Sequence, residues 1–213
     1  MPVYRRIPWR GAARAITPRM GALHESSMFA GINTISDPQN AEFLERRTES
    51  VCFTGHRFIG KADAPYLARL AELLELLYER GYRDYLCGGA LGFDLFAAEQ
   101  VVILRNRHPD VRLISCIPCK EQCTHWRAND QNRYRRLLYL SDEVRVLSNF
   151  YYEGCMQVRN KYMVDRSSVC VAYLKRPRGG TMSTSCYASS QDLILVNLGV
   201  ISAVDEYAHA YPL

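Results

Sequence analysis

Short apolar runs alternate with longer helical patterns from Val51 onward, and this alternation restricts the fold more than any other feature of the chain. Each run is short enough for a strand, and several give way to glycine or polar residues before the next helix begins. Strands joined through helices need crossover connections, so neighbouring strands run parallel. We therefore expect an α/β fold of the Rossmann-like, doubly wound type, with a mainly parallel sheet of about six strands and helices on both faces.

The pattern also predicts where the elements lie. In the first helix Leu67, Leu70, Leu74 and Leu77 form one apolar stripe, Asp63 is the expected N-cap, and Gly81 ends the helix. The expected strands cover residues 51–54, 84–87, 111–117, 143–147, 169–174 and 193–198. The expected helices cover residues 63–80, 93–106, about 121–139, 155–166 and 180–190.

Residues 1–49 differ from the rest of the chain. Prolines and glycines interrupt any helix there, and five arginines precede the first acidic residue, Glu25. We expect this segment to be an unstructured extension and residues 50–213 to form the domain. An organellar transit peptide and a true start at Met20 or Met28 are alternatives that the sequence leaves open.

The overall composition favours a cytoplasmic protein with a sizeable core. The hydrophobic content is 48%, and no apolar run reaches the roughly 18 residues that would span a bilayer. The net charge of +5 is too small to indicate duplex DNA binding. Four of the eight cysteines, Cys52, Cys87, Cys116 and Cys170, lie in expected strands, where cysteine acts as a small apolar residue. Together with the lack of a visible signal peptide, this favours free thiols in a reducing compartment.

Two glycine-containing loops follow consecutive strands and resemble phosphate cradles. The first is Thr54-Gly55-His56-Arg57, and the second is Gly88-Gly89-Ala90-Leu91-Gly92-Phe93-Asp94. Glycine lets the backbone approach an anion closely, and the following helix offers unpaired N–H groups. Such loops also serve close helix–strand packing alone. In a parallel sheet both loops lie at the carboxyl ends of the strands, where ligands bind.

Several polar residues are expected at this same edge of the sheet. Arg57 can bind phosphate, and His56 can donate to it or act as an acid or base, although both could simply cap a turn. Asp94 can cap its helix, the use we favour, or bind a ribose hydroxyl. Arg159 and Asn160, near a helix start, can face a ligand, with an Arg159–Asp165 ion pair as the competing use. Gly179, Gly180 and Thr181 form a third glycine-containing turn.

Two further patterns have a structural and a functional interpretation. Cys116, Cys119, Cys123 and His125 have a spacing found in metal sites, but the expected strand places Cys116 in the sheet, so we predict no metal. Cys119 could instead be an exposed thiol. A basic, aromatic helix could bind nucleic acid, but a charged outer face explains it more simply. Its residues are Arg127, Arg133, Tyr134, Arg135, Arg136 and Tyr139.

Together these motifs resemble the SLOG superfamily, a Rossmann-like group that includes the Smf/DprA and lonely-guy proteins, and most of all its YpsA-like branch. The resemblance covers residues 50–200. It rests on 51–57, the loop from Gly88 to Asp94, Pro118 with Gln122 and Trp126, Arg159-Asn160-x-x-Met163-Val164-Asp165, and Gly179-Gly180-Thr181. It implies a nucleotide-like ligand, a nucleoside phosphate or an NAD or ADP-ribose derivative, held by the glycine loops, Arg57 and Arg159. It also implies a homodimer and no required cofactor.

One departure from the family affects the expected activity. Lonely-guy proteins have a catalytic glutamate soon after the Gly-Gly-x-Gly-Thr loop, whereas here no acidic residue follows Gly180 before Asp192. A sensor or regulatory module that binds the nucleotide is therefore the first hypothesis. The second is a nucleotide N-glycosidase with Asp94 or His56 as acid or base. The third is single-strand DNA binding of the DprA kind through the basic helix.

Overall fold

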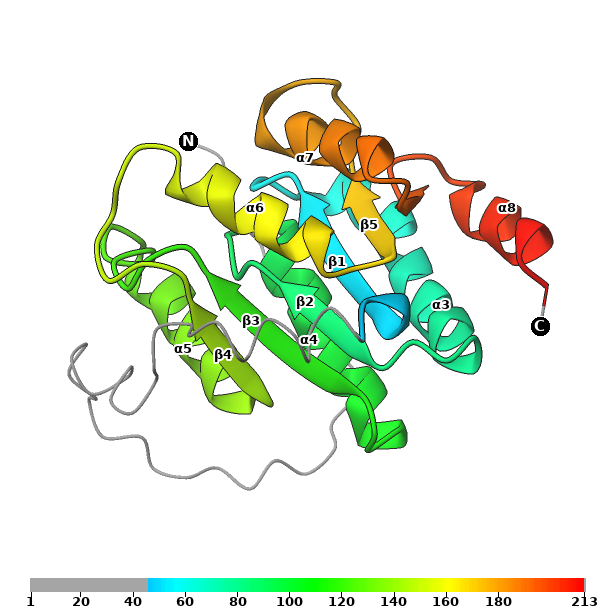
Figure 1. Ribbon diagram of the computed structural model, residues 1–213, viewed down its shortest axis with the longest axis horizontal. Helices are drawn as coiled ribbons and strands as arrows, with labels where there is room; N and C mark the ends of the chain where they lie inside the picture. Colours follow the sequence, from blue (N-terminus) through cyan, green and yellow to red (C-terminus); the bar gives the residue numbers. More distant parts are fainter. Residues whose placement is uncertain (1–45, 213) are drawn as a thin grey trace.

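The computed structural model describes residues 46–212 and contains one sheet of six parallel strands. The strand order is β4-β3-β2-β1-β5-β6, so the chain builds outward from β1 to β4 and then returns to the other side of β1. Figure 1 shows the strand arrows pointing toward one edge. The strands are β1 (Ser50–Gly55), β2 (Asp84–Cys87), β3 (Arg112–Ile117), β4 (Glu143–Val146), β5 (Val169–Tyr173) and β6 (Ile194–Asn197).

Six α-helices alternate with the strands and cover both faces of the sheet (Figure 1). They are α3 (Ala64–Glu79), α4 (Phe93–Arg107), α5 (Ala128–Leu140), α6 (Cys155–Asp165), α7 (Gly179–Ser190) and α8 (Ala203–Ala210). The larger core lies under α3, α4, α5 and α8. The smaller core lies under α6 and α7. The expected Rossmann-like α/β fold is confirmed, and no helix among residues 46–212 is long and apolar enough to cross a membrane.

The strand sequences explain why the sheet is closed in on both sides. Every residue of β2 and β5 is buried, as is every residue of β1 except its last, Gly55. Continuous burial is the mark of parallel strands covered by helices on both faces. On α3 the predicted leucine stripe is fully buried, with Leu73 beside it. The first strand and helix thus form the centre of the larger core.

Residues 46–49, which the sequence analysis assigned to the N-terminal extension, pack against the domain. A short 3-10 helix, η1 (Arg47–Glu49), leads directly into β1. Arg46 pairs with the buried carboxylate of Asp84 at 3.2 Å, and Arg47 Nε donates to the Ser167 carbonyl at 3.1 Å. The expectation for residues 1–45 lies outside the described residues.

Three local expectations are wrong. Residues 121–127 form turns rather than the start of a helix, because the Gln131 side chain binds the carbonyls of Cys123, Thr124 and Trp126 ahead of α5. Helix α8 was not expected, although its buried Val204 and Tyr207 have helical spacing. Asp63 occupies the N-cap position of α3 as expected, but its side chain does not form the expected capping hydrogen bond.

The Asp63 carboxylate has other partners. It accepts from the Gly60 N–H at 2.7 Å and from the Tyr173 hydroxyl at 2.5 Å, and it pairs with Lys175 at 3.1 Å. These donors lower the pKa of Asp63 although partial burial opposes them. Asp63 therefore joins the segment ahead of α3 to the end of β5.

Candidate ligand site

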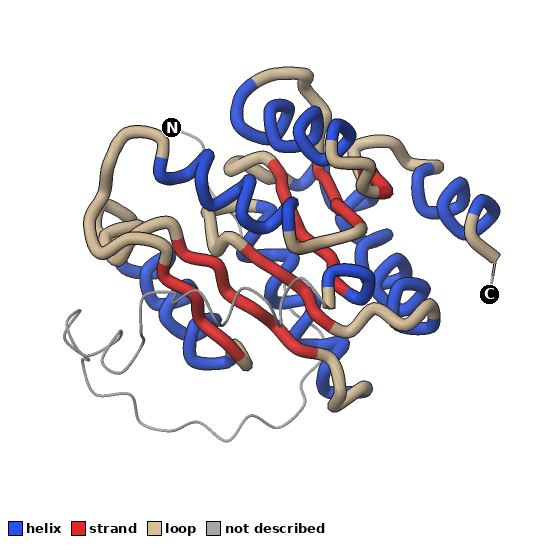
Figure 2. Tube along the Cα trace, viewed as in Figure 1, coloured by secondary structure: helices blue, strands red, loops and turns tan. Residues whose placement is uncertain are grey.

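A cavity of about 1110 Å³ lies at the carboxyl edge of the sheet, where the strand order reverses between β1 and β5. The loops after β1, β2, β4 and β5 line it, and Figure 2 shows the long loops after β4 and β5 at this edge. This is the place where open parallel sheets bind ligands. The segment after β3 does not line the cavity.

The two glycine loops pack against each other. The His56 carbonyl accepts the N–H of Phe93, the first residue of α4, at 3.1 Å. A Cβ at Gly92, where φ is +84°, would collide with the carbonyls of His56 and Arg57, and one at Gly55 would collide with the Phe93 side chain. Both glycines therefore serve close packing, and Gly55 also lines the cavity, whereas Gly92 does not.

Gly88 and Gly89 lie behind the cavity wall. Both are buried, and neither lines the cavity, whereas Ala90 and Asp94 do. Gln122 Nε2 donates to the Gly88 carbonyl at 3.2 Å and to the Gly89 carbonyl at 2.9 Å. The segment after β3 thus supports the second glycine loop from outside the cavity.

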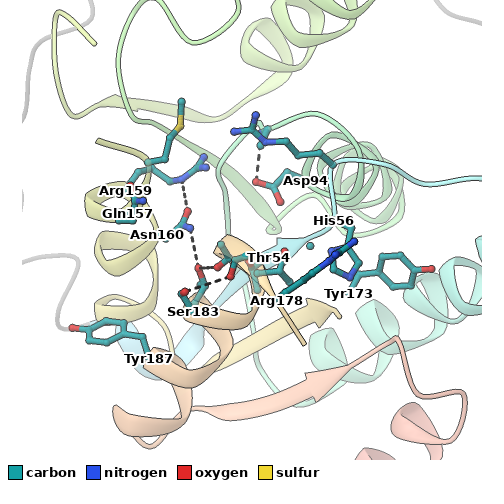
Figure 3. A pocket seen from close by; sticks show the side chains of 18 of the residues that line it. Thr54, His56, Asp94, Gln157, Arg159, Asn160, Tyr173, Arg178, Ser183 and Tyr187 are labelled. Atoms are coloured by element: carbon teal, nitrogen blue, oxygen red, sulfur yellow. Dashed lines mark hydrogen bonds between the residues drawn. The ribbon is translucent and has the colours of Figure 1, made fainter. Parts of the chain in front are cut away.

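Arg159 and Asn160 connect three parts of the site (Figure 3). Arg159 is 4% exposed; its Nη1 donates to the Gly88 carbonyl and its Nε donates to Asn160 Oδ1 at 2.8 Å. Asn160 Nδ2 in turn donates to Thr184 Oγ1 of α7 at 2.8 Å. Asp165 accepts from the Tyr187 hydroxyl at 2.7 Å and does not form the alternative ion pair with Arg159. Both predicted residues line the cavity, and both also hold α6 in place.

Asp94 is a buried carboxylate that faces the cavity, and the expectation that it caps α4 is wrong. The N-cap residue is Gly92, and Asp94 Oδ2 accepts from the N–H of Ala90, ahead of the helix, at 3.4 Å. Asp94 is 5% exposed. Burial raises the pKa of Asp94 to about 6, although the positive charge of Arg159 opposes the shift. Its Oδ1 has no hydrogen-bond partner among residues 46–212.

His56 holds the loop after β5. Its Nε2 lies 3.1 Å from the Lys175 N–H and 3.3 Å from the Arg176 N–H. Backbone N–H groups can only donate, so Nε2 accepts and the proton of the neutral ring is on Nδ1. Burial and the nearby charge of Arg176 lower the pKa of His56. Its role in the unliganded protein is therefore that of a turn-capping group.

The cavity has an excess of positive charge. Six cationic and three carboxylate side chains line it. Lys175 is paired with Asp63, but the guanidinium groups of Arg57, Arg176 and Arg178 form no hydrogen bond or ion pair with any residue from 46 to 212. All three are exposed. The loop after β5 thus contributes three cations that the sequence analysis did not name as site residues, Lys175, Arg176 and Arg178. The basic run Lys175-Arg176-Pro177-Arg178 was the available signal.

The first turns of α4, α6 and α7 all contribute lining residues. No side chain caps any of the three, and Gly179 and Gly180 at the start of α7 border open space. Thr54 and Thr181 are 7% and 8% exposed, and their hydroxyls have no partner in the described part of the chain. The arrangement offers N–H donors, hydroxyls and arginines to an anion, and one buried carboxylate to a donor.

The cysteine motif is part of the core. Cys116, Cys119 and Cys123 are fully buried, so the alternative of Cys119 as an exposed thiol is wrong. Burial raises the pKa of Cys119 to about 11, and the Cys119 thiol forms a hydrogen bond with the Cys155 thiol. No group of three metal-binding side chains occurs between residues 46 and 212. All eight cysteines fall in this range and are free.

The basic helix α5 is occupied mainly by structural contacts. Arg133 binds Glu99 through two hydrogen bonds of 2.6 and 2.7 Å, and Tyr134 is fully buried. Arg135 donates to Gln131. Arg136 and Tyr139 remain exposed.

Comparisons with known proteins agree with this architecture. Protein YoqJ of Bacillus subtilis (strain 168), an uncharacterized SPbeta prophage-derived protein, is 34% identical over 131 residues, which cover 56% of this chain and 77% of YoqJ. A UPF0398 protein of Halalkalibacterium halodurans is 32% identical over 109 residues, covering 50% of this chain and 58% of the relative.

Two solved structures have a similar fold. DNA processing protein A of Streptococcus pneumoniae superposes with a TM-score of 0.52 at 16% identity, covering 79% of this chain and 58% of that one. DNA processing protein A of Helicobacter pylori, described for its single-stranded DNA binding mode, gives 0.50 at 20% identity, covering 72% and 66%. These likenesses establish the fold alone. The model of the YspA SLOG family matches residues 66–192, more than half of the chain, and the protein therefore belongs to the YspA SLOG family.

Proposed function

We propose that the cavity binds a nucleotide-like ligand, a nucleoside phosphate or an ADP-ribose-like derivative, and that the protein serves as a sensor or regulatory module. One observation carries the proposal. The open first turn of α7 and three unpaired arginines face the same cavity as three buried polar side chains with free atoms: the hydroxyls of Thr54 and Thr181 and the Oδ1 of Asp94.

The α7 end of the cavity suits phosphate. N–H groups at a helix N-terminus favour an anion, and the bare backbone at Gly179 and Gly180 lets phosphate oxygens approach closely. Arg178 precedes this turn directly, Arg176 lies on the same loop, and Arg57 lies on the loop after β1. Three like charges without counter-ions repel one another, so a phosphate would relieve this repulsion and gain charge-assisted hydrogen bonds.

The buried polar groups suit the sugar. A carboxylate with a free oxygen is the usual acceptor for ribose hydroxyls in Rossmann-like sites, and Asp94 supplies one. The volume of about 1110 Å³ is slightly above the range of about 300–1,000 Å³ typical of small-molecule sites. The cavity is therefore large enough for a whole nucleotide rather than a free phosphate.

The arrangement of acids favours binding over turnover. Asp192, the first acidic residue after Gly180, lies beyond the end of α7 and so a helix length away from the glycine turn. His56 already accepts two backbone hydrogen bonds. N-glycosidic cleavage remains a second candidate for one reason. The Asp94 pKa of about 6 is close to what a general acid needs at neutral pH.

Isothermal titration calorimetry with AMP, ADP-ribose and inorganic pyrophosphate tests the proposal. Arg178→Ala and Arg57→Ala should weaken binding about 10- to 100-fold each, since hydrogen bonds to charged groups contribute about 1.5–3 kcal/mol. Arg136→Ala, which removes an exposed arginine of α5 away from the cavity, is the matched control and should leave affinity unchanged.

Absence of binding by all three ligands, or equal losses in Arg136→Ala and Arg178→Ala, would contradict the proposal. Chromatography of the same mixtures separates binder from enzyme. Release of free adenine from AMP by the wild-type protein, and not by Asp94→Asn, would support N-glycosidic cleavage.

A further inference from the structure

Two aromatic side chains line the cavity without a partner. Tyr151, on the loop between β4 and α6, is 62% exposed, and Phe58, on the loop after β1, is 79% exposed. Neither ring stacks on another ring or on a cation among residues 46–212. Other rings that line the cavity have contacts: Tyr173 packs on Phe93 and His56, and Lys161 lies over Tyr187.

The backbone that carries Tyr151 is held firmly. The Glu121 carboxylate accepts the Tyr151 N–H at 2.7 Å. The preceding residue, Phe150, is held by Ser148, whose Oγ accepts the Phe150 N–H at 3.2 Å and donates to the Phe150 carbonyl at 2.7 Å. The loop is therefore anchored by its backbone, while the ring of Tyr151 is left open to the cavity. An anchored loop presents a ring with little loss of conformational entropy on binding.

From this placement we infer that Tyr151 and Phe58 form a stacking platform for the base of the ligand. The ligand is then a nucleotide with an intact aromatic base rather than a sugar phosphate. The inference rests on the proposed function. Aromatic side chains stack on any nucleobase because every base has a π-face. Phosphate at the α7 turn and the base at the platform place the two ends of one ligand on different loops of the same cavity.

The chemistry of the platform also predicts its selectivity. Stacking carries no hydrogen-bond code, so the platform should tolerate different bases and favour purines, which offer more area than pyrimidines. A ligand without a base leaves both rings exposed to water. Ribose 5-phosphate should accordingly bind about 5- to 150-fold more weakly than AMP, since stacking on an aromatic side chain contributes about 1–3 kcal/mol per base.

Calorimetric titration of AMP and ribose 5-phosphate into the wild-type protein and four variants tests this inference. Tyr151→Ala and Phe58→Ala should each weaken AMP binding about ten-fold and leave ribose 5-phosphate binding unchanged. Tyr151→Phe keeps the ring and should retain AMP affinity. Phe150→Ala is the matched control, because Phe150 is a neighbour on the same loop and is 73% exposed but does not line the cavity.

The outcomes separate the two proposals. Equal affinity of the wild-type protein for AMP and ribose 5-phosphate would overturn the platform and leave the phosphate site standing. Equal losses for both ligands in Tyr151→Ala would also overturn it. Binding of neither ligand would refute the proposed function and the platform together. Tyr151→Ala could instead change the sedimentation coefficient, which reports the oligomeric state, and leave the affinities for both ligands unchanged. The ring would then contact another protein chain, and the platform would be refuted.

Discussion

Replacing Asp94 by asparagine should stabilise the unliganded protein and weaken its affinity for a nucleotide. The carboxylate is 5% exposed and has one backbone donor, the Ala90 N–H at 3.4 Å. Burial raises the pKa from 3.8 to about 6 even though Arg159 lowers it. The folded environment as a whole therefore disfavours the ionised form, and a neutral side chain of the same shape removes that cost.

The size of the effect follows from the pKa difference. Each unit corresponds to about 1.4 kcal/mol, so a shift from 3.8 to about 6 costs the folded state about 3 kcal/mol at neutral pH. Because the folded-state pKa is the higher one, the folded protein takes up the proton first on acidification. The cost is therefore complete above about pH 7 and disappears as the pH falls through 6 toward 4.

Urea unfolding of the wild-type and Asp94→Asn proteins at two pH values measures this. At pH 7.5 the variant should be more stable by about 3 kcal/mol, or about 6–12 °C in Tm for a domain of this size. At pH 5 the difference should fall to about half. Asp130→Asn, at a partly buried position in the first turn of α5 where the carboxylate has no hydrogen-bond or ion-pair partner among residues 46–212, is the control and should change stability by less than about 1 kcal/mol.

A loss of stability in Asp94→Asn at pH 7.5 would refute the reasoning. It would mean that the charge of Arg159 more than compensates for burial, and that Asp94 serves the fold. Stabilisation together with about ten-fold weaker AMP binding would instead indicate a carboxylate kept for the ligand at the expense of stability.

Three further changes have defined outcomes. Gly92→Ala should lower the free energy of unfolding in urea by at least about 2 kcal/mol, because φ is +84° and a Cβ would collide with two backbone carbonyls. Gly180 borders open space, so Gly180→Ala should leave the free energy of unfolding unchanged and impair only ligand binding. Equal losses of stability in the two variants would contradict this. Gln122→Ala should destabilise by about 1–3 kcal/mol because it leaves the Gly89 carbonyl without its side-chain donor and removes one of the two side-chain donors to the Gly88 carbonyl. A neutral effect in urea unfolding would show that the loop needs no support. The pKa of His56 is lower in the folded state, so the folded protein favours the neutral ring, and the free energy of unfolding of the wild-type protein should decrease as the pH falls below about 6.5. His56→Ala should lack this pH-dependent contribution when urea unfolding at pH 7.5 and 5.5 is compared. An identical pH dependence in both proteins would refute the role of the ring.

The fold could be predicted because periodicity decides it. Each strand is a buried apolar run, and the stripe of Leu67, Leu70, Leu74 and Leu77 marks α3 without ambiguity. The expected strand 84–87 coincides with β2, and the other strands differ by a residue or two at their ends. The helix expected from residue 121 was wrong because side-chain hydrogen bonds from Gln131 to turn carbonyls, which periodicity does not reveal, hold that segment in turns.

The site was predicted by location more than by role. Strand order alone places the loops after β1, β2, β4 and β5 around one cavity. Roles depend on partners that are distant in sequence: His56 binds backbone N–H groups about 120 residues away, and Arg159 binds the Gly88 carbonyl. For the same reason the packing contacts that require glycine at Gly55 and Gly92 could not be predicted, and Arg176 and Tyr151 emerge as lining residues only in three dimensions.

The central claim is that the open first turn of α7 receives the phosphate of a nucleotide. A titration of ¹⁵N-labelled protein with AMP, followed through the backbone amide resonances, tests it most directly. The account predicts the largest shifts at Gly180 and Thr181, smaller ones near Arg57, and none at the start of α5, whose first turn lies outside the cavity. Saturating shifts confined to α5, or no shifts at millimolar AMP, would contradict it.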